Sequence, residues 1–168
     1  MNPPPTFSSP LASRLPRWIL IWFAISIPLV VWDVAFVLLR PMSMPGGALS
    51  FLWAPYAKYI TIDRSYGDLG NGFVWSQAIM SCAEVVMALY AIAARRRAIA
   101  TLLVFCVSVL TCAKTILILV IVFVTRFADI GGSTTDVVFL YFVPNGVWVV
   151  MPLAVAWSTG RALISPAR

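Results

Sequence analysis

The chain has 168 residues, of which 61% are hydrophobic and only 11% are charged, and it contains no histidine. Soluble domains are about half apolar and about a quarter charged, so this composition excludes an ordinary soluble protein and predicts one integral membrane domain. The net charge of +6 comes mostly from basic residues that flank apolar runs, where they set membrane topology. We therefore expect no nucleic-acid partner, and without histidine we expect no metal site.

Four apolar runs organise the chain. Residues 1–16 are rich in proline and serine and are expected to form a disordered tail. The runs that follow each have at least the ~20 residues that a helix needs to cross the hydrocarbon: Trp18–Leu39, Gly72–Ala94, Ala98–Val124 and Val137–Leu163. They lack the alternation of barrel strands. The expected fold is therefore all-α, a four-helix membrane bundle over residues 17–164, with a short tail at 165–168.

The basic residues predict the orientation of this bundle. With four spans, both termini and the Arg95–Arg97 turn share one side of the membrane. Of the 12 Lys and Arg residues, seven lie on that side, four on the other, and Lys114 lies within a span. Because cytoplasmic segments carry the excess of Lys and Arg, both termini are expected in the cytoplasm. The long, aromatic-rich connection at 41–71 would then be a partly helical lumenal lid, or alternatively an aromatic belt at the interface.

Three charged side chains, Asp33, Glu84 and Lys114, lie inside the apolar runs. A charge at the bilayer centre costs ~2.5–3.5 kcal/mol on insertion scales, so such groups normally face a bundle interior and serve a function. Counted from the lumenal ends at ~1.5 Å per residue, these three residues share one layer, about 10–18 Å deep, with Asn145 and Trp148. We therefore expect one polar chamber within the bundle.

Helical spacing supports such a chamber, because residues three, four and seven apart share a helix face. The polar residues of every run follow this spacing: Ser26 and Asp33; Gln77, Ser81 and Glu84; Ser108, Thr111 and Lys114 or Thr115; Tyr141, Asn145 and Trp148.

Two interpretations of Lys114 stay open. It either pairs with Asp33 or Glu84 and fixes the helix register, or it takes part in the function. Two carboxyl groups against one lysine leave one acid without a cation, and such an acid is expected to stay protonated in a chamber of low dielectric. A protonated acid, a second carboxylate and the Trp148 indole suit carbocation chemistry without a cofactor. The acid protonates an alkene or epoxide, the indole face holds the cation, and the second carboxylate stabilises charge or removes a proton.

Several strings resemble the emopamil-binding protein superfamily, which includes the sterol Δ8–Δ7 isomerases. They are LWAPYAK at 52–58, DRSY at 63–66, Glu84, and the N-x-x-W-x-x-x-P pattern that begins at Asn145. The resemblance covers residues 20–163. It implies the four-helix EXPERA fold, an endoplasmic reticulum membrane, a terpenoid or sterol ligand and a homodimer. It also implies acid–base roles for Asp33 and Glu84, with Trp148 stabilising the cation.

Two departures from the sterol isomerases are visible, besides an additional N-terminal span that this chain does not show. Leu29 occupies the position of their histidine, and Lys114 is foreign to their pattern. The resemblance therefore favours a terpene cyclase or isomerase of terpenoid biosynthesis. A sterol isomerase and a non-catalytic binding protein similar to the sigma-two receptor are the alternatives. A transporter is a third interpretation, against which stands the absence of repeated halves.

These arguments give a set of candidate site residues. Asp33, Glu84 and Trp148 are predicted to be catalytic. The predicted substrate-binding residues are Asn145, Tyr141, Asp63, Trp53, Tyr56, Tyr66 and Lys114.

Overall fold

The computed structural model describes residues 15–164, so most of the expected N-terminal tail and the C-terminal tail lie outside the described residues. The described part is helical, apart from one isolated antiparallel bridge between Asp63 and Ile130. The elements are α1 (Arg17–Leu38), η1 (Ser50–Trp53), α2 (Tyr56–Ile62), α3 (Arg64–Gly67), α4 (Gly72–Ala93), α5 (Ala98–Val124), α6 (Thr134–Asp136), η2 (Val137–Phe142) and α7 (Val143–Ile164). The all-α prediction is confirmed.

Four helical stretches are long and apolar enough to cross a membrane, as predicted: α1, α4, α5 and the continuous run Thr134–Ile164. The fourth begins three residues before the predicted Val137. The reason is an N-cap, because the Ser133 hydroxyl accepts a hydrogen bond from the Asp136 N–H at 3.1 Å and starts the helix there. The π-helical turn η2 then leads without a break into α7, in which Pro144 is the second residue.

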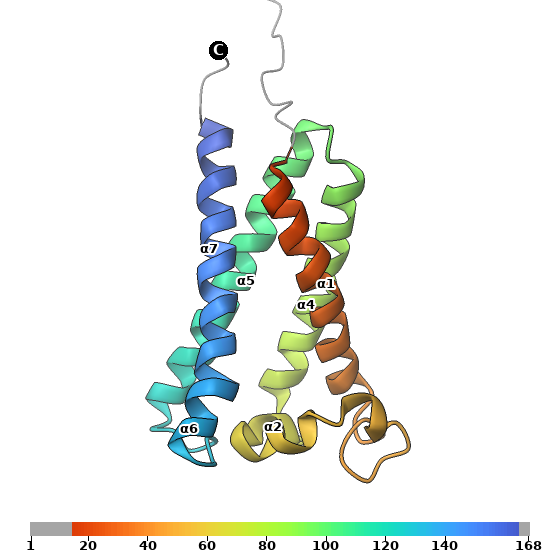
Figure 1. Ribbon diagram of the computed structural model, residues 1–168, viewed down its shortest axis with the longest axis vertical. Coiled ribbons are helices and arrows are strands. Elements are labelled where there is room, and N and C mark those ends of the chain that lie inside the picture. Colours follow the sequence, from red (N-terminus) through yellow and green to blue (C-terminus); the bar gives the residue numbers. More distant parts are fainter. Residues whose placement is uncertain (1–14, 165–168) are drawn as a thin grey trace, which may run out of the picture.

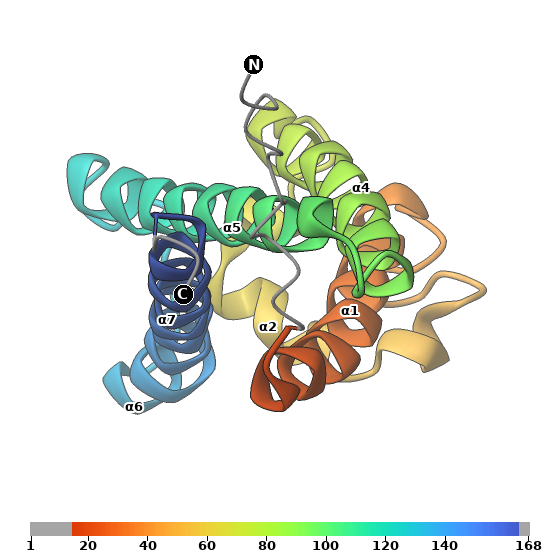
Figure 2. The ribbon, with the colours of Figure 1, turned by 90° about the horizontal axis from the view of Figure 1, so that it is seen from above.

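The bundle is built from neighbouring pairs. Helix α1 packs on α4, α4 on α5 and α5 on α7, an order that is visible from above in Figure 2. The start of α1, the turn between α4 and α5 and the end of α7 all lie at one end of the bundle (Figure 1). The outward faces carry large apolar side chains, which suit lipid better than water; Val86, Val124, Phe139, Val150 and Trp157 are each more than 60% exposed.

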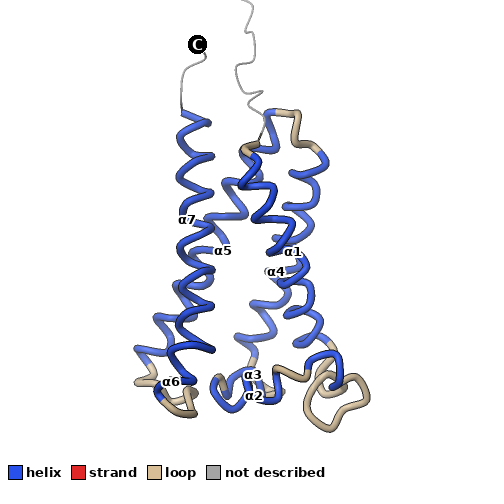
Figure 3. The backbone as a smooth tube through the Cα atoms, viewed as in Figure 1, coloured by secondary structure: helices blue, strands red, loops and turns tan. Residues whose placement is uncertain are grey.

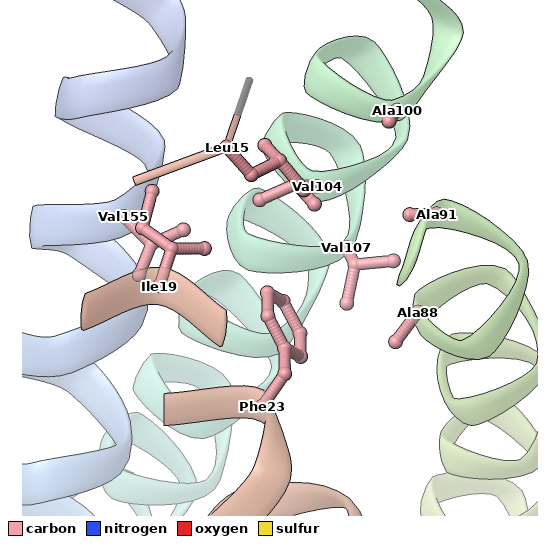
Figure 4. Close-up of a cluster of buried hydrophobic side chains, with 9 residues drawn as sticks. All are labelled: Leu15, Ile19, Phe23, Ala88, Ala91, Ala100, Val104, Val107 and Val155. Atoms are coloured by element: carbon pink, nitrogen blue, oxygen red, sulfur yellow. The ribbon is translucent and has the colours of Figure 1, made fainter. Parts of the chain in front are cut away.

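A dry cluster ties the four long helices together at the end that holds the termini (Figure 4). Ile19 and Phe23 of α1 meet Ala88 and Ala91 of α4, and residues of α5 and α7 complete the cluster: Ala100, Val104, Val107 and Val155, with Leu15 just before α1. Small residues let helix backbones approach closely, which drives helix association in lipid, where the hydrophobic effect contributes little.

The segment at residues 41–71 lies across the opposite end of the bundle and contains η1, α2 and α3 (Figure 3). It is joined to the loop between α5 and α6 by two backbone hydrogen bonds, from the Gly131 N–H to the Ile62 carbonyl at 2.8 Å and from the Arg64 N–H to the Asp129 carbonyl at 2.9 Å. Gly131 is required here, because a Cβ atom would lie 2.7 Å from the carbonyl oxygen of Thr61.

Buried aromatic packing holds the same segment to α1. Phe36 is fully buried, with its ring centroid 4.1 Å from that of Tyr56 and 6.4 Å from that of Trp53. The buried Arg40 side chain adds hydrogen bonds from Nη1 to the carbonyl oxygens of Tyr66 at 2.9 Å and Asp68 at 3.2 Å. The 41–71 segment is therefore anchored on both sides of the bundle.

We expect Phe36→Ala to destabilise the protein, because truncating a buried Phe typically costs about 3 kcal/mol or more. In a protein of this size that corresponds to a fall of roughly 6–12 °C in melting temperature, measured on the detergent-solubilised protein. Phe51→Ala, at a side chain that is 72% exposed, is the matched control and should leave the melting temperature unchanged. Equal melting temperatures for the two variants would contradict the packing described here.

Candidate functional site

A cavity of about 400 Å³ lies inside the bundle, bounded by α1, α4, α5 and α7 and closed at one end by α2 and α3. Its volume falls in the range of roughly 300–1,000 Å³ that is typical of small-molecule sites. Much of its wall is apolar, including Leu29, Val30, Ile118 and Leu140. Seven of the predicted site residues line it: Asp33, Tyr56, Tyr66, Glu84, Lys114, Asn145 and Trp148. The five side chains that the sequence places at one depth therefore meet in one cavity.

Glu84 and Lys114 form an ion pair between α4 and α5. Lys114 Nζ lies 2.9 Å from Glu84 Oε1, and the two side chains are only 10% and 8% exposed. Lys114 also donates a hydrogen bond to Ser81 Oγ at 2.6 Å, and Thr111 Oγ1 donates to Glu84 Oε2 at 2.8 Å. Such partners are what a buried charge needs. Glu84 is thus the acid that Lys114 neutralises, which decides the partner that the sequence left open.

Asp33 has a different environment. Two tyrosine hydroxyls from the 41–71 segment donate to its carboxyl group, Tyr56 to Oδ1 at 2.5 Å and Tyr66 to Oδ2 at 3.2 Å. No Lys or Arg among the described residues lies within ion-pair distance of Asp33. Burial raises the pKa of the Tyr56 and Tyr66 hydroxyls above its ordinary value, so both remain donors at neutral pH.

Trp148 and Asn145 enter the cavity from α7. The Trp148 ring meets the Trp22 ring of α1 edge to face, with 5.3 Å between centroids, so this contact spans α1 and α7. The side-chain amide of Asn145 donates to the Tyr141 carbonyl oxygen one turn earlier, at 2.8 Å. The indole of Trp148 is therefore held in place by a neighbouring ring beside the two acids, and the amide of Asn145 is fixed by its own helix.

Three predicted site residues are not among the side chains that line the cavity. The Trp53 indole N–H donates to the Trp32 carbonyl oxygen at 2.8 Å, and its ring packs against Phe36. Tyr141 is 1% exposed and packs in an apolar cluster with Ile62 and Val122. The Asp63 carboxylate caps α3 by accepting from the Ser65 N–H at 3.1 Å and from its hydroxyl. Burial raises the pKa of Asp63, against the opposing effect of the Ser65 hydrogen bonds.

Other lining residues were not predicted to belong to the site. Gln77, Ser81 and Thr115 line the cavity and carried a signal, because Gln77 and Ser81 share a helix face with Glu84, and Thr115 shares one with Thr111. Tyr59 also lines it, and its ring meets that of Tyr66 at a centroid distance of 5.2 Å. Leu29 lies one turn before Asp33 and also lines the cavity. Its signal came from the resemblance alone, since an apolar residue in an apolar helix looks like any lipid-facing position.

A metal site is not formed by these groups: within residues 15–164, no three His, Cys, Asp or Glu side chains lie close enough to hold an ion. The ionisable groups that line the cavity are two carboxyl groups, one ammonium group and three tyrosine hydroxyls. One acid forms an ion pair and the other is held by neutral donors. Two carboxyl groups in unlike environments are suited to opposite roles in proton transfer.

Comparison with known families gives one match. The family described as EXPERA (EXPanded EBP superfamily) matches residues 48–159, which is 112 of the 168 residues. The chain belongs to the EXPERA superfamily. The predicted membership is thereby confirmed, and with four apolar helices the protein is an integral membrane protein. No curated protein and no solved structure matches the chain.

The EXPERA match begins after α1, and it includes Glu84, Lys114 and Trp148. Asp33 lies outside the matched residues, and the structure places it in the site because it lines the same cavity.

We expect Lys114→Met to destabilise the protein by about 3–5 kcal/mol, because it leaves the Glu84 carboxylate buried without a counter-charge. The double variant Lys114→Met/Glu84→Gln should recover most of this loss, since it removes both charges. Thermal unfolding of the four members of this double-mutant cycle measures the coupling. Losses that simply add in the double variant would show that the two side chains do not form a pair.

Proposed function

We propose that this protein is a membrane-embedded enzyme that protonates a lipophilic isoprenoid substrate and guides the resulting carbocation to a cyclised or isomerised product. A terpene cyclase or isomerase of terpenoid biosynthesis fits best, and a sterol Δ8–Δ7 isomerase is the nearest variant. One observation carries the proposal: a single apolar cavity contains an acid without a cation partner, a second acid in an ion pair, and an indole ring.

Asp33 is the proton donor in this scheme. With an alkene, the proton moves to one carbon, the π electron pair forms the new C–H bond, and the other carbon becomes cationic. With an epoxide, the proton moves to the oxygen, the electron pair of the breaking C–O bond stays on the oxygen, and the carbon becomes cationic. The carboxylate that remains accepts the hydroxyl hydrogen bonds of Tyr56 and Tyr66. Hydrogen bonds aimed at a developing charge lower the barrier because they need no reorganisation during the reaction.

Trp148 and Glu84 act on the cation. An aromatic face attracts a desolvated cation by about 2 kcal/mol or more, and the Trp148 ring lines the cavity. Glu84, as the carboxylate of the ion pair, removes a proton from a carbon next to the cation, and the C–H electron pair becomes the new double bond. Lys114 holds this carboxylate in place and stays bound throughout.

The cavity walls support a lipophilic substrate. Apolar and aromatic residues make up 14 of the 21 residues that line the cavity. The 41–71 segment acts as a lid over one end and, with the loop between α5 and α6, shields the cation from water.

The setting of the enzyme is also part of the proposal. Both termini face the cytoplasm, because the end of the bundle that carries them holds the larger share of Lys and Arg. The membrane is that of the endoplasmic reticulum, and the protein forms a homodimer, both by analogy with the superfamily.

Asp33→Asn and Glu84→Gln are each expected to lower product formation by about 100-fold or more, the range for loss of a group that transfers a proton. Membranes containing the protein are incubated with a Δ8-sterol or with a linear or epoxidised farnesyl-bearing substrate, and products are identified by mass spectrometry and NMR. Asp129→Asn, at an exposed acid that does not line the cavity, is the control and should retain full turnover. Unchanged turnover in either cavity variant would refute its assigned role.

Trp148→Phe should lower turnover by about tenfold and increase the share of products that form early along the cation pathway. The benzene ring holds a cation less well than the indole, a difference of about 1 kcal/mol, and it also weakens the contact with Trp22. Product ratios at equal conversion measure this effect. A product pattern identical to that of the parent protein would show that Trp148 does not touch the cation.

A binding protein without chemistry is the second candidate, and the environment of Asp33 favours it. Asp33, an acid with no cation partner among residues 15–164, lines a cavity that is also lined by Trp32, Tyr56, Tyr59 and Tyr66, and such a site can hold a cationic amphiphile. Saturable binding of such a ligand, with no product from either substrate class, would select this function.

A further inference from the structure

A second and much smaller chamber lies beside Glu84, toward the end of the bundle that carries the termini. Its volume is about 30 Å³. Phe23, Ala88 and Val107 of the apolar cluster in Figure 4 form part of its wall, with Trp22 and Pro152. Glu84 and Val30 line both this chamber and the main cavity. Glu84 therefore stands between the two spaces.

The wall of this chamber contains a hydroxyl group without a partner. Ser108 is 2% exposed, and its Oγ makes no hydrogen bond. Three other hydroxyls of the bundle, those of Ser81, Thr115 and Thr159, each donate to the backbone carbonyl four residues earlier at 2.8–2.9 Å. A serine inside a helix normally makes this bond, and leaving a buried hydroxyl unpaired costs about 1–3 kcal/mol. Ser108 therefore lacks a partner that the chamber is placed to supply.

Further polar groups converge on the same chamber from three helices. Ser26 of α1 and Glu84 of α4 line it together with Ser108 and Thr111 of α5. A water molecule needs a space of at least ~10–15 Å³ and two to four polar partners. The chamber satisfies both conditions, since its volume is about 30 Å³.

We propose that this chamber is a water-binding site, in which one water molecule accepts a hydrogen bond from the Ser108 hydroxyl and donates one to the Glu84 carboxylate. The water gives Ser108 its missing partner and holds Glu84 from the chamber side, while Lys114 holds it from the main cavity. Ser108 is thus a positioning residue for the base of the reaction. This last step rests on the proposed function, whereas the water site does not.

The first test is a crystal or cryo-EM structure of the parent protein at about 2 Å resolution or better, the range in which buried waters are seen. We expect a single density peak within hydrogen-bonding distance of both Ser108 Oγ and the Glu84 carboxylate. A chamber without density, or one filled by part of an apolar ligand or lipid, would overturn the proposal.

The second test compares Ser108→Ala with Thr101→Val. Thr101 lies two turns earlier on α5, is also 2% exposed and also has an unpartnered hydroxyl, but it does not line the chamber. The carboxylate stretching band of Glu84 is identified in the infrared spectrum by its loss in Glu84→Gln. We expect this band to shift in Ser108→Ala and to stay in place in Thr101→Val. The same response in both variants would refute the water contact.

Turnover gives the third readout. Misplacing a reacting group by about 1 Å can cost about 100-fold, and we expect Ser108→Ala to lower kcat by about tenfold. KM should stay within about twofold, because the substrate does not touch the chamber. Thr101→Val should retain the parent kcat, and an equal loss in both variants would count against positioning. A parent protein that binds isoprenoids without converting them would refute the proposed function, while the density and the infrared band would still decide the water site.

Discussion

The ion pair between Glu84 and Lys114 is the constraint on which the interior of this bundle depends. Each charge alone would cost several kcal/mol inside the bilayer, so neither side chain is tolerable there without the other. At 2.9 Å the pair fixes α4 against α5, and the hydroxyls of Ser81 and Thr111 complete its coordination. Because α5 also carries α7, the register set at this pair determines where Trp148 enters the cavity.

The same pair decides how the two acids differ. Lys114 pairs with Glu84, so Asp33 accepts hydrogen bonds from neutral groups only. The two carboxyl groups of the cavity are chemically alike, but only one of them lies beside a positive charge. Division of labour between carboxyl groups requires unlike environments rather than unlike side chains. In this protein the difference comes from one lysine on α5 and two tyrosines that follow α1 in the chain.

The sequence was sufficient for the features that depend on long or periodic signals. Four spans follow from apolar runs of about 20 residues, and the shared depth of Asp33, Glu84 and Lys114 follows from the constant rise of a helix. The partner of Lys114 could not be predicted, because the rotation of three helices decides which acid lies nearer. The tyrosine donors of Asp33, 23 and 33 residues away in the chain, depend on how an irregular connection folds back.

That connection is also where sequence reasoning on the site was least specific. Trp53, Tyr56 and Tyr66 belong to one aromatic-rich segment, yet Trp53 packs on Phe36 while the two tyrosines reach the cavity. Aromatic composition indicates that a segment is buried against something, but the local turns determine which rings face inward. The start of the fourth helix shows the same limit on a smaller scale, since a single serine cap moved it by three residues.

The two tyrosines that hold Asp33 have a consequence for the timing of the catalytic cycle. They belong to the segment that closes the cavity, so their hydrogen bonds to the carboxyl group of Asp33 also hold that segment against α1. Hydrogen bonds to an ionised acceptor are roughly twice as strong as those between neutral groups. The 41–71 segment is therefore held more tightly to Asp33 when Asp33 is ionised than when it is protonated. Because Glu84 takes the proton from the cation, Asp33 stays ionised when the product forms. Closure is then tightest from the first proton transfer until Asp33 is protonated again, and it relaxes after that.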